Sequence, residues 1–273
     1  VGMDLVMHPL LKAVGFTGSF SGGRSLFNAA ASREIPIPVY AEMGSTNPVI
    51  FLPGIISDRG PELAKNYVDS VTLGVGQFCT NPGISILIGG DENHPFVKKT
   101  AELMEQIECG TMLNKRTYDN YNQGIANLSK SRHVKILTNS TSEIGKAKSH
   151  LFITDSISFQ ANSQLSEEIF GPASLIVTVR NKDELKDLIR TFKGFLTISL
   201  FGNETDLHEY GDFLPCLEEK AGRIIYNSFP TGVEVSPAMN HGGPYPATTD
   251  SRSTSVGTAS IDRFVRPVCY QNW

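Results

Sequence analysis

The sequence predicts an α/β fold, in which an open sheet carries helices on both of its faces. Short apolar segments of strand length alternate with longer segments of helical periodicity along most of the chain. Gly, Pro and Asn residues stand between these segments, where turns are expected. This alternation is typical of sheets whose strands are connected by crossover helices. With 273 residues, the chain is long enough for one large domain or two small ones.

The first third of the chain has the most regular alternation. We expect strands and helices in turn, with strands at residues 13–17, 38–43, 48–52 and 84–88 and helices at residues 18–31 and 61–75. The last of these helices has apolar residues on or near one face, namely Leu63, Tyr67, Val68, Val71 and Leu73. A helix-like stretch directly follows Val1-Gly2-Met3, so we expect the beginning of the protein to be missing.

The rest of the chain continues this alternation and then changes in composition. We expect helices at residues 94–109, 115–128, 182–192 and 207–221, and strands at residues 134–138, 151–154, 173–179, 196–201 and 224–227. Asn181 is the expected N-cap of one helix, and Gly222 closes another at its C-terminal cap. Residues 228–257 are rich in Gly, Pro, Ser and Thr, and such a long loop is usually functional or covered by a partner. The tail at residues 261–270 could add an edge strand.

The composition excludes several classes of function. The net charge is −4, so the chain has no basic excess that would attract nucleic acid or an anionic membrane. No apolar run approaches the roughly 20 residues that span a bilayer. The four cysteines, Cys79, Cys109, Cys216 and Cys269, are widely spaced and form no zinc-binding pattern with histidine. In a chain of this length they indicate the reduced thiols of a cytosolic, cytoplasmic protein.

Cys79 is the candidate nucleophile. It lies in Gly76-Gln77-Phe78-Cys79-Thr80-Asn81-Pro82-Gly83, where the last residues cannot continue a long helix and indicate an irregular backbone. Free cysteine has a pKa of ~8.5, so a catalytic cysteine needs a helix N-terminus or backbone N–H donors to favour its thiolate. The alternative is a small structural side chain, because free cysteines are among the most buried residues. The other three cysteines have no comparable setting.

Glu42 is the candidate general base. It follows a predicted strand and precedes Met43-Gly44-Ser45, so its carboxylate can project from the end of the strand into a cleft. A general base works best with a pKa near the working pH, which partial burial can give to a carboxyl group. The alternative is a solvated carboxylate in a turn. Together, Cys79 and Glu42 suggest covalent thiol catalysis with a general base.

Two further segments have patterns that suggest a ligand. In Glu167-Glu168-Ile169-Phe170-Gly171-Pro172, Glu168 can accept hydrogen bonds from ligand hydroxyls while Phe170 packs against an aromatic ring. The alternative is a helix that ends in exposed acids. In Val14-Gly15-Phe16-Thr17-Gly18-Ser19, a strand runs through a Gly-rich turn into a helix, whose N-terminus favours anions. This segment is neither GxGxxG nor a P-loop, and the alternative is a tight turn between strand and helix.

The histidines give little direct indication of a site. No Ser-His-Asp order is present, and none of the six histidines has an Asp or Glu partner at ligand spacing in the sequence. His241 precedes Gly242-Gly243-Pro244 and is the only one in a loop that looks like part of a site.

Taken together, these segments resemble the NAD(P)-dependent aldehyde dehydrogenase superfamily. Four motifs occur in the family's order and at fitting spacings, namely Phe16-Thr17-Gly18-Ser19, Glu42-Met43-Gly44, Gly76-Gln77-Phe78-Cys79 and Glu168-Ile169-Phe170-Gly171-Pro172. The resemblance covers nearly all of the chain but only about the second half of such an enzyme. Within the superfamily it is strongest for bacterial α-ketoglutaric semialdehyde (2,5-dioxopentanoate) dehydrogenases. The finer resemblance rests on three stretches, which are residues 76–83, residues 229–235, and residues 241–246 with 253–257 and 266–268.

The resemblance implies a mechanism. Cys79 would attack the aldehyde carbon to give a thiohemiacetal, whose oxyanion would be held by the Cys79 N–H and an Asn from the upstream half. Hydride transfer to NAD or NADP would leave a thioester, and Glu42 would activate the water that hydrolyses it. Glu168 would orient the nicotinamide ribose, and Ser19 would face the pyrophosphate. The implied cofactor contacts are Phe16, Thr17, Gly18, Ser19, Met43, Glu168 and Phe170, and the implied substrate tunnel comprises Phe78, Thr80, Phe229 and Thr231.

The resemblance also implies a division of the chain and a set of partners. Residues 1–43 would end a Rossmann-type cofactor-binding domain, residues 44–240 would form the catalytic domain, and residues 241–273 would form a C-terminal loop and interface segment. We expect a homodimer or homotetramer that acts on a small-molecule aldehyde, without nucleic acid, membrane or metal. The chain departs from the family's pattern where Pro244-Tyr245-Pro246 replaces the usual Lys after the Gly-Gly of the late loop.

Three alternatives remain open from the sequence. The enzyme could be a fatty or long-chain aldehyde dehydrogenase, like that of luminous bacteria. The chain could be a catalytically silent domain, because the cofactor-binding half lies upstream. It could also be a thiol hydrolase that uses Cys79 without a nicotinamide, although the lack of a well-placed histidine base counts against this. The residues that distinguish NAD from NADP also lie upstream.

Overall fold

The computed structural model describes all residues except 140–142, 144 and 233–234. The strands are β1 (Val14–Thr17), β2 (Val39–Glu42), β3 (Val49–Phe51), β4 (Ile84–Ile88), β5 (Gly110–Thr111), β6 (Lys135–Ile136), β7 (Lys146–Ala147), β8 (His150–Asp155), β9 (Ala173–Val179), β10 (Phe195–Phe201) and β11 (Ala221–Tyr226). The α-helices are α1 (Gly2–Met7), α2 (Phe20–Ala31), α3 (Pro53–Thr72), α4 (Pro95–Gln106), α5 (Lys115–Ser129), α6 (Ser156–Ala161), α7 (Lys182–Thr191), α8 (Glu204–Tyr210) and α9 (Leu214–Glu218). Short 3₁₀ helices are η1 (Leu73–Gly76), η2 (Ser163–Ser166), η3 (Gly211–Phe213) and η4 (Thr258–Phe264).

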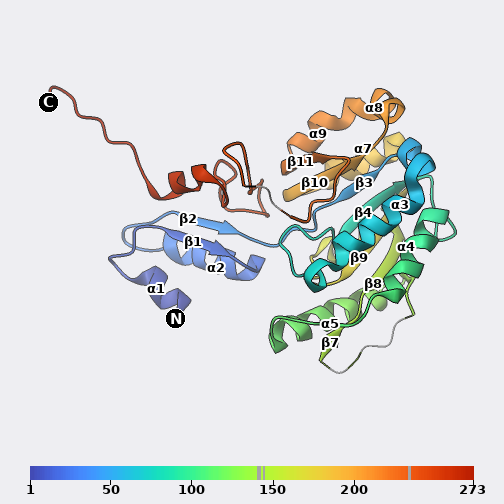
Figure 1. Cartoon of the computed structure of the whole chain (residues 1–273). Coiled ribbons are helices and arrows are strands. Elements are labelled where there is room, and N and C mark those ends of the chain that lie inside the picture. The colour runs from blue at the N-terminus through green and yellow to red at the C-terminus, as the bar shows by residue number, and fades with distance from the viewer. Residues whose placement is uncertain (140–142, 144, 233–234) are drawn as a thin grey trace.

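The main body is a seven-stranded sheet in the order β11-β10-β3-β4-β9-β8-β6. Its strands pair in parallel, except that β6 pairs antiparallel with β8 at one edge. A smaller parallel pair, β1-β2, lies to one side together with α1 and α2 (Figure 1). None of the helices in the described part of the chain is long and apolar enough to cross a membrane.

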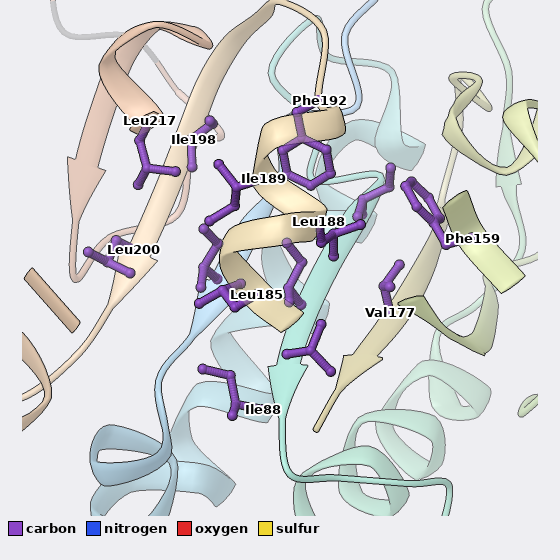
Figure 2. Close-up of a cluster of buried hydrophobic side chains, with 14 of the residues drawn as sticks. Ile88, Phe159, Val177, Leu185, Leu188, Ile189, Phe192, Ile198, Leu200 and Leu217 are labelled. Carbon is purple, nitrogen blue, oxygen red and sulfur yellow. The ribbon is translucent and has the colours of Figure 1, made fainter. Parts of the chain in front are cut away.

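Helices cover both faces of the main sheet. Alternate residues of a strand point to opposite faces, so in β3 Val49 and Phe51 pack with α3 and α4, whereas Ile50 packs on the other side. On that other side the apolar face of α7 lies against β9 and β10, as Figure 2 shows for Leu188 and Ile189. The predicted fold class, an α/β sheet with helices on both faces, is therefore confirmed.

The helix expected at residues 61–75 begins earlier, at Pro53. Proline is tolerated in a first helical turn because its missing N–H would have no helical partner there. The N-cap, Leu52, has no side-chain acceptor, and the carboxylate of Asp206 accepts hydrogen bonds from the N–H groups of Gly54 and Ile55, both at 2.8 Å. A kink at Arg59 precedes Pro61, which explains why the sequence pattern indicated a later start.

The helix expected at residues 207–221 is wrong as a single element. The chain instead forms α8, η3 and α9, and Pro215 stands at the start of α9, where a proline fits best. Gly222 lies inside β11 and does not cap a helix. Its role is steric, because a Cβ there would lie 2.1 Å from the carbonyl oxygen of Gly242.

The tail does not form the expected edge strand. Residues 258–264 form η4 and the remaining residues extend away from the body without a described strand (Figure 1). The tail contacts the β1-β2 sheet through a side chain, since the ring of Phe264 packs edge-on against Tyr40, with ring centroids 5.8 Å apart. Short elements that the sequence did not indicate are β5, β7, α6 and η2.

Asp206 joins the first turns of two helices, α3 and α8, so its loss has a predictable cost. Its buried carboxylate also accepts from the N–H of Asn203 at 3.0 Å. We expect Asp206→Ala to lower the free energy of unfolding by roughly 2–3 kcal/mol, since charged caps of two helices are lost. Urea unfolding followed by circular dichroism measures this. Glu204→Ala, at an exposed position in the same helix, is the control and should cost less than ~1 kcal/mol. Equal effects of the two changes would contradict the capping role.

Candidate active site

The site lies at the edge of the main sheet where its parallel strands begin. Residues 44–48 lead into β3, residues 76–83 lead into β4, and residues 168–172 lead into β9. Because neighbouring parallel strands start at the same edge, segments far apart in the sequence meet there.

Gly76 marks the closest approach of two of these segments. Its φ is +64°, and a Cβ atom would stand 2.3 Å from the carbonyl of Gly171, so a side chain does not fit. Asn81 Nδ2 also donates a hydrogen bond to the Gly171 carbonyl oxygen, at 3.1 Å. The segment of Cys79 is thereby fixed against the segment that carries Glu168.

Asn47 holds the backbone around Cys79. Its side chain is fully buried, and Nδ2 donates to the carbonyl oxygens of Cys79 and Asn81, both at 2.9 Å, and of Ser45 at 3.0 Å. Its Oδ1 accepts from the Ser45 hydroxyl at 2.9 Å and from the Thr197 hydroxyl at 3.2 Å. One amide therefore joins the beginnings of β3, β4 and β10.

Cys79, His241 and Glu42 form a row of hydrogen-bonding groups. The Sγ atom of Cys79 lies 3.5 Å from Nε2 of His241, and Nδ1 of His241 lies 2.8 Å from Oε2 of Glu42. The polar atoms of the three side chains all lie within 4.8 Å of one another. Glu42 and His241 are each 5% exposed, and Cys79 is half-buried. The structure thus brings the two residues singled out from the sequence together, with a histidine between them.

No histidine has an acidic partner at ligand spacing in the sequence, but the fold gives His241 one. The partner is Glu42, 199 positions away in the sequence, and the sulfur of Cys79 is 162 positions away. Sequence spacing detects acid–histidine pairs on one helix or in one turn, whereas this pair forms only after the C-terminal loop folds back onto β2. An isolated antiparallel β-bridge between Glu42 and Thr248 lies where the loop packs onto the end of β2.

The loop around His241 is held by its own hydrogen bonds. The His241 N–H donates to the Thr254 hydroxyl, and the Ser255 N–H donates to the His241 carbonyl oxygen, both at 2.8 Å. The Ser255 hydroxyl donates to Oε2 of Glu42 at 2.5 Å, so the carboxylate has two partners. Asn240 Nδ2 donates to the Gly222 carbonyl oxygen at 2.8 Å, which ties the loop to β11.

The charge of His241 depends on these neighbours. Burial by itself lowers the pKa of a histidine, because it disfavours the imidazolium. Here the hydrogen bonds to Cys79 and Glu42, with their charges, outweigh burial and raise the pKa of His241 to about 9. At neutral pH both ring nitrogens then carry a proton, one facing the sulfur and one facing the carboxylate.

Glu168 reaches the same edge from the segment before β9. Its Oε2 lies 2.1 Å from where a Cβ on Gly44 would stand, so this glycine makes room for the carboxyl group. Desolvation raises the pKa of Glu168 to about 7, and a backbone hydrogen bond with Ser45 opposes that rise. Other parts of Glu168 stay exposed, as does Phe170, with 37% of its surface accessible.

The turn between β1 and α2 lies next to Glu42. Thr17 pairs with Glu42 across the small sheet, and the Gly18 N–H donates to the Glu42 carbonyl oxygen at 3.1 Å. Ser19 is the N-cap of the 12-residue helix α2, and its hydroxyl accepts from the Gly22 N–H at 3.3 Å. A Cβ on Gly18 would lie 2.7 Å from the ring of Phe16. A strand, a close-packed glycine turn and a capped helix N-terminus together suit the phosphates of a dinucleotide.

Met43 and the tunnel candidates differ in their surroundings. Met43 is 2% exposed and packs against α2 at Gly23. Phe78 is 39% exposed beside Cys79, whereas Thr80 is 1% exposed. The ring of Phe229 packs on Phe201, with centroids 4.5 Å apart, and the Thr231 hydroxyl bonds to that of Ser70. Of the same loop, Val233 and Glu234 lie outside the described residues.

Three residues of the site were not assigned a role from the sequence. His241 was noted only for its loop, Ser255 only within a family stretch, and Asn47 not at all. An asparagine close before an expected strand and a histidine before two glycines are sequence features that could have indicated Asn47 and His241. Neither feature predicts which residues these side chains contact.

The fold and the site together define an α/β protein with an assembled thiol–imidazole–carboxylate centre. A family model described as the aldehyde dehydrogenase family matches residues 1–262. The chain therefore belongs to that family.

Named relatives fit this assignment. The chain is 45% identical over its whole length to an α-ketoglutaric semialdehyde dehydrogenase of Acinetobacter baylyi, and 43% identical to α-ketoglutaric semialdehyde dehydrogenase 2 of Azospirillum brasilense, covering 52% of each. It thus spans about half the length of these relatives. A solved structure of an aldehyde dehydrogenase mutant from Bacillus cereus matches with a TM-score of 0.77 at 18% identity, over 96% of this chain and 52% of that one. This structural similarity confirms the fold.

The raised pKa of His241 predicts a pH-dependent contribution to stability. The pKa in the folded chain lies above the ordinary value of 6.5, so the stabilisation is fully present below pH ~6.5 and is lost as pH rises through about 9. The difference in unfolding free energy between the wild type and His241→Gln should shrink accordingly. Urea unfolding at several pH values measures it, with His208→Gln on exposed α8 as the control. A difference that stays constant with pH would contradict the imidazolium assignment.

Proposed function

We propose that this chain is the catalytic part of an NAD(P)-dependent aldehyde dehydrogenase that oxidises 2,5-dioxopentanoate or a related semialdehyde to the carboxylate. The observation that carries the proposal is the row of Cys79, His241 and Glu42, with Sγ 3.5 Å from the imidazole and the imidazole 2.8 Å from the carboxylate. The names of the two relatives at 45% and 43% identity support the substrate class.

In the first half of the reaction, Cys79 supplies the nucleophile. Nε2–H of the His241 imidazolium faces the sulfur, and the thiolate of Cys79 adds to the aldehyde carbon to form a thiohemiacetal. Glu42 accepts a hydrogen bond from Nδ1–H, so the positive charge of the ring is compensated in a buried place. The oxyanion forms beside the backbone N–H groups around Cys79, which Asn47 keeps in place from the carbonyl side.

The cofactor residues inferred from the family fit the geometry of the β1–α2 turn. Phe16, Thr17, Gly18 and Ser19 form the close-packed turn before α2, and the carboxyl group of Glu168 lies against Gly44. NAD(P)+, when bound, supplies the acceptor for the hydride that leaves the thiohemiacetal. The carboxyl group of Glu168 suits hydrogen bonds to ribose hydroxyls, and its pKa of about 7 lets it act as donor or acceptor.

In the second half, water attacks the thioester on Cys79. The Glu42–His241 pair accepts a proton from that water, and the acid is released as the thiol re-forms. Aldehyde, water and NAD(P)+ would thereby give the carboxylate, NAD(P)H and two protons.

A thiol hydrolase without a nicotinamide is the second candidate. His241 supplies the histidine partner of Cys79 whose absence from the sequence pattern counted against this reaction. The two candidates differ in one measurement. Ester hydrolysis at full rate without cofactor, together with no aldehyde oxidation, would favour the hydrolase.

We further infer a cytoplasmic homodimer or homotetramer. Exposed apolar side chains on the C-terminal segment, such as Phe264, Val265 and Tyr270, support an interface there. Analytical ultracentrifugation tests this, since a monomer at micromolar concentration would exclude it.

Replacing the sulfur tests the proposed nucleophile. Cys79→Ala should lower aldehyde oxidation with NAD or NADP by several orders of magnitude, because the covalent route is lost, while circular dichroism stays unchanged. Cys216→Ala, at a half-buried thiol outside the site, should retain activity. Turnover of Cys79→Ala like that of the wild type would refute the proposal.

Replacing the carboxylate separates the two halves of the reaction. Glu42→Gln leaves the sulfur in place but removes the charge that holds the imidazolium and accepts the water proton. We expect a burst of NAD(P)H in the first turnover, followed by a steady state slower by roughly 10²–10⁴-fold. Stopped-flow absorbance at the nicotinamide band measures both phases. A steady state equal to that of the wild type would rule out Glu42 from hydrolysis of the thioester.

A further inference from the structure

Arg223 is a cation beside the proposed reaction centre that the reaction itself does not use. It lies on β11, directly after Gly222, whose carbonyl oxygen accepts the hydrogen bond from Asn240. A Cβ on Gly222 would lie 2.1 Å from the Gly242 carbonyl oxygen, so β11 is packed against the loop of His241 at this point. The residue before Arg223 therefore contacts the loop that holds the imidazole against Cys79.

The guanidinium group is poorly satisfied. Its Nε is buried without a hydrogen-bond partner. One terminal nitrogen lies 3.8 Å from the sulfur of Met239, and the other lies 3.5 Å from the carbonyl oxygen of Pro230, so both contacts are weak. Within the described part of the chain, no carboxylate forms an ion pair with it. A half-buried guanidinium with spare donors suits an anion, because its planar fork binds carboxylates through two parallel hydrogen bonds.

The electrostatics link this cation to the sulfur of Cys79. One terminal nitrogen of Arg223 lies 3.8 Å from the sulfur of Met239, two residues before His241, and the imidazole of His241 lies 3.5 Å from Sγ of Cys79. Burial lowers the pKa of Arg223, and the charge of Cys79 opposes that change. Arg223 also contacts the loop of Phe229 and Thr231 through Pro230, which is the loop inferred to line the aldehyde tunnel. An aldehyde held at Cys79 can therefore extend toward a positive charge.

We propose that Arg223 binds the carboxylate of the substrate, and that it makes the enzyme prefer aldehydes that carry a terminal carboxylate over uncharged aldehydes of the same length. This inference rests on the proposed function and names the residue that selects its substrate class. The aldehyde end meets Cys79, and the carboxylate meets the free donors of Arg223. The cost of burying the substrate's charge is offset by the cation that is already buried there.

A matched pair of substrates tests the proposal in the enzyme that contains this chain. The pair is 5-oxopentanoate and pentanal, which differ in the carboxylate. Arg223→Gln should lower kcat/KM for 5-oxopentanoate by roughly 10–100-fold, the range for hydrogen bonds to a charged group, and leave pentanal within about twofold. Arg223→Lys should recover part of the loss, because the charge returns without the fork. Arg252→Gln removes the same charge from an exposed position near Ser255 and should alter neither substrate.

The outcomes separate this inference from the proposed function. If the wild type oxidises neither aldehyde with NAD or NADP, the proposed function fails. If it oxidises both and Arg223→Gln lowers both equally, or lowers neither, Arg223 does not select the carboxylate. The activity on pentanal also reports that the variant is folded.

A binding measurement on the chain needs no turnover. Glutarate should protect Cys79 from alkylation by iodoacetamide, and the half-protecting concentration should rise roughly tenfold or more in Arg223→Gln. If the variant instead alkylates at a different rate without glutarate, while protection by glutarate is unchanged, the arginine acts on the sulfur and the proposal is overturned.

Discussion

The site depends on a single imidazole placed between a sulfur and a carboxylate. His241 contacts Cys79 on one side and Glu42 on the other, so one ring connects the segment before β4 with the end of β2. Each partner raises the pKa of the ring against the effect of burial, and a positive charge in a buried place is acceptable only because both partners are present. The loop of His241 is in turn fixed by Thr254, Ser255 and Asn240.

This dependence explains the architecture around the site. The sheet brings together the beginnings of β3, β4 and β9, and glycines at Gly44, Gly76 and Gly171 allow their leading segments to pack without side chains between them. Asn47 then fixes the backbone at Cys79 by donating a hydrogen bond to its carbonyl oxygen. The rigid part of the site is thus made of backbone and one buried amide, while the chemistry is left to the three side chains in the row.

The sequence predicted the α/β class and the strands of the main sheet, because local periodicity and turn chemistry carry that information. It also singled out Cys79 and Glu42, and the structure brings their side chains together around His241. The sequence did not predict the break between α8 and α9, where Pro215 starts a new helix, or the strand position of Gly222. Nor did it find the acid partner of His241, since contacts across 199 positions leave no local pattern. Arg223 likewise falls between the helix expected at residues 207–221 and the strand expected at residues 224–227, where no local pattern indicates a site.

The most direct measurement of the central claim is an NMR titration of the His241 ring. The ring should titrate near pH 9 in the wild type, and its pKa should fall in both Cys79→Ala and Glu42→Gln, because each partner supports the imidazolium. A ring that titrates near its ordinary value of ~6.5 in all three proteins would show that Cys79 and Glu42 do not hold an imidazolium between them.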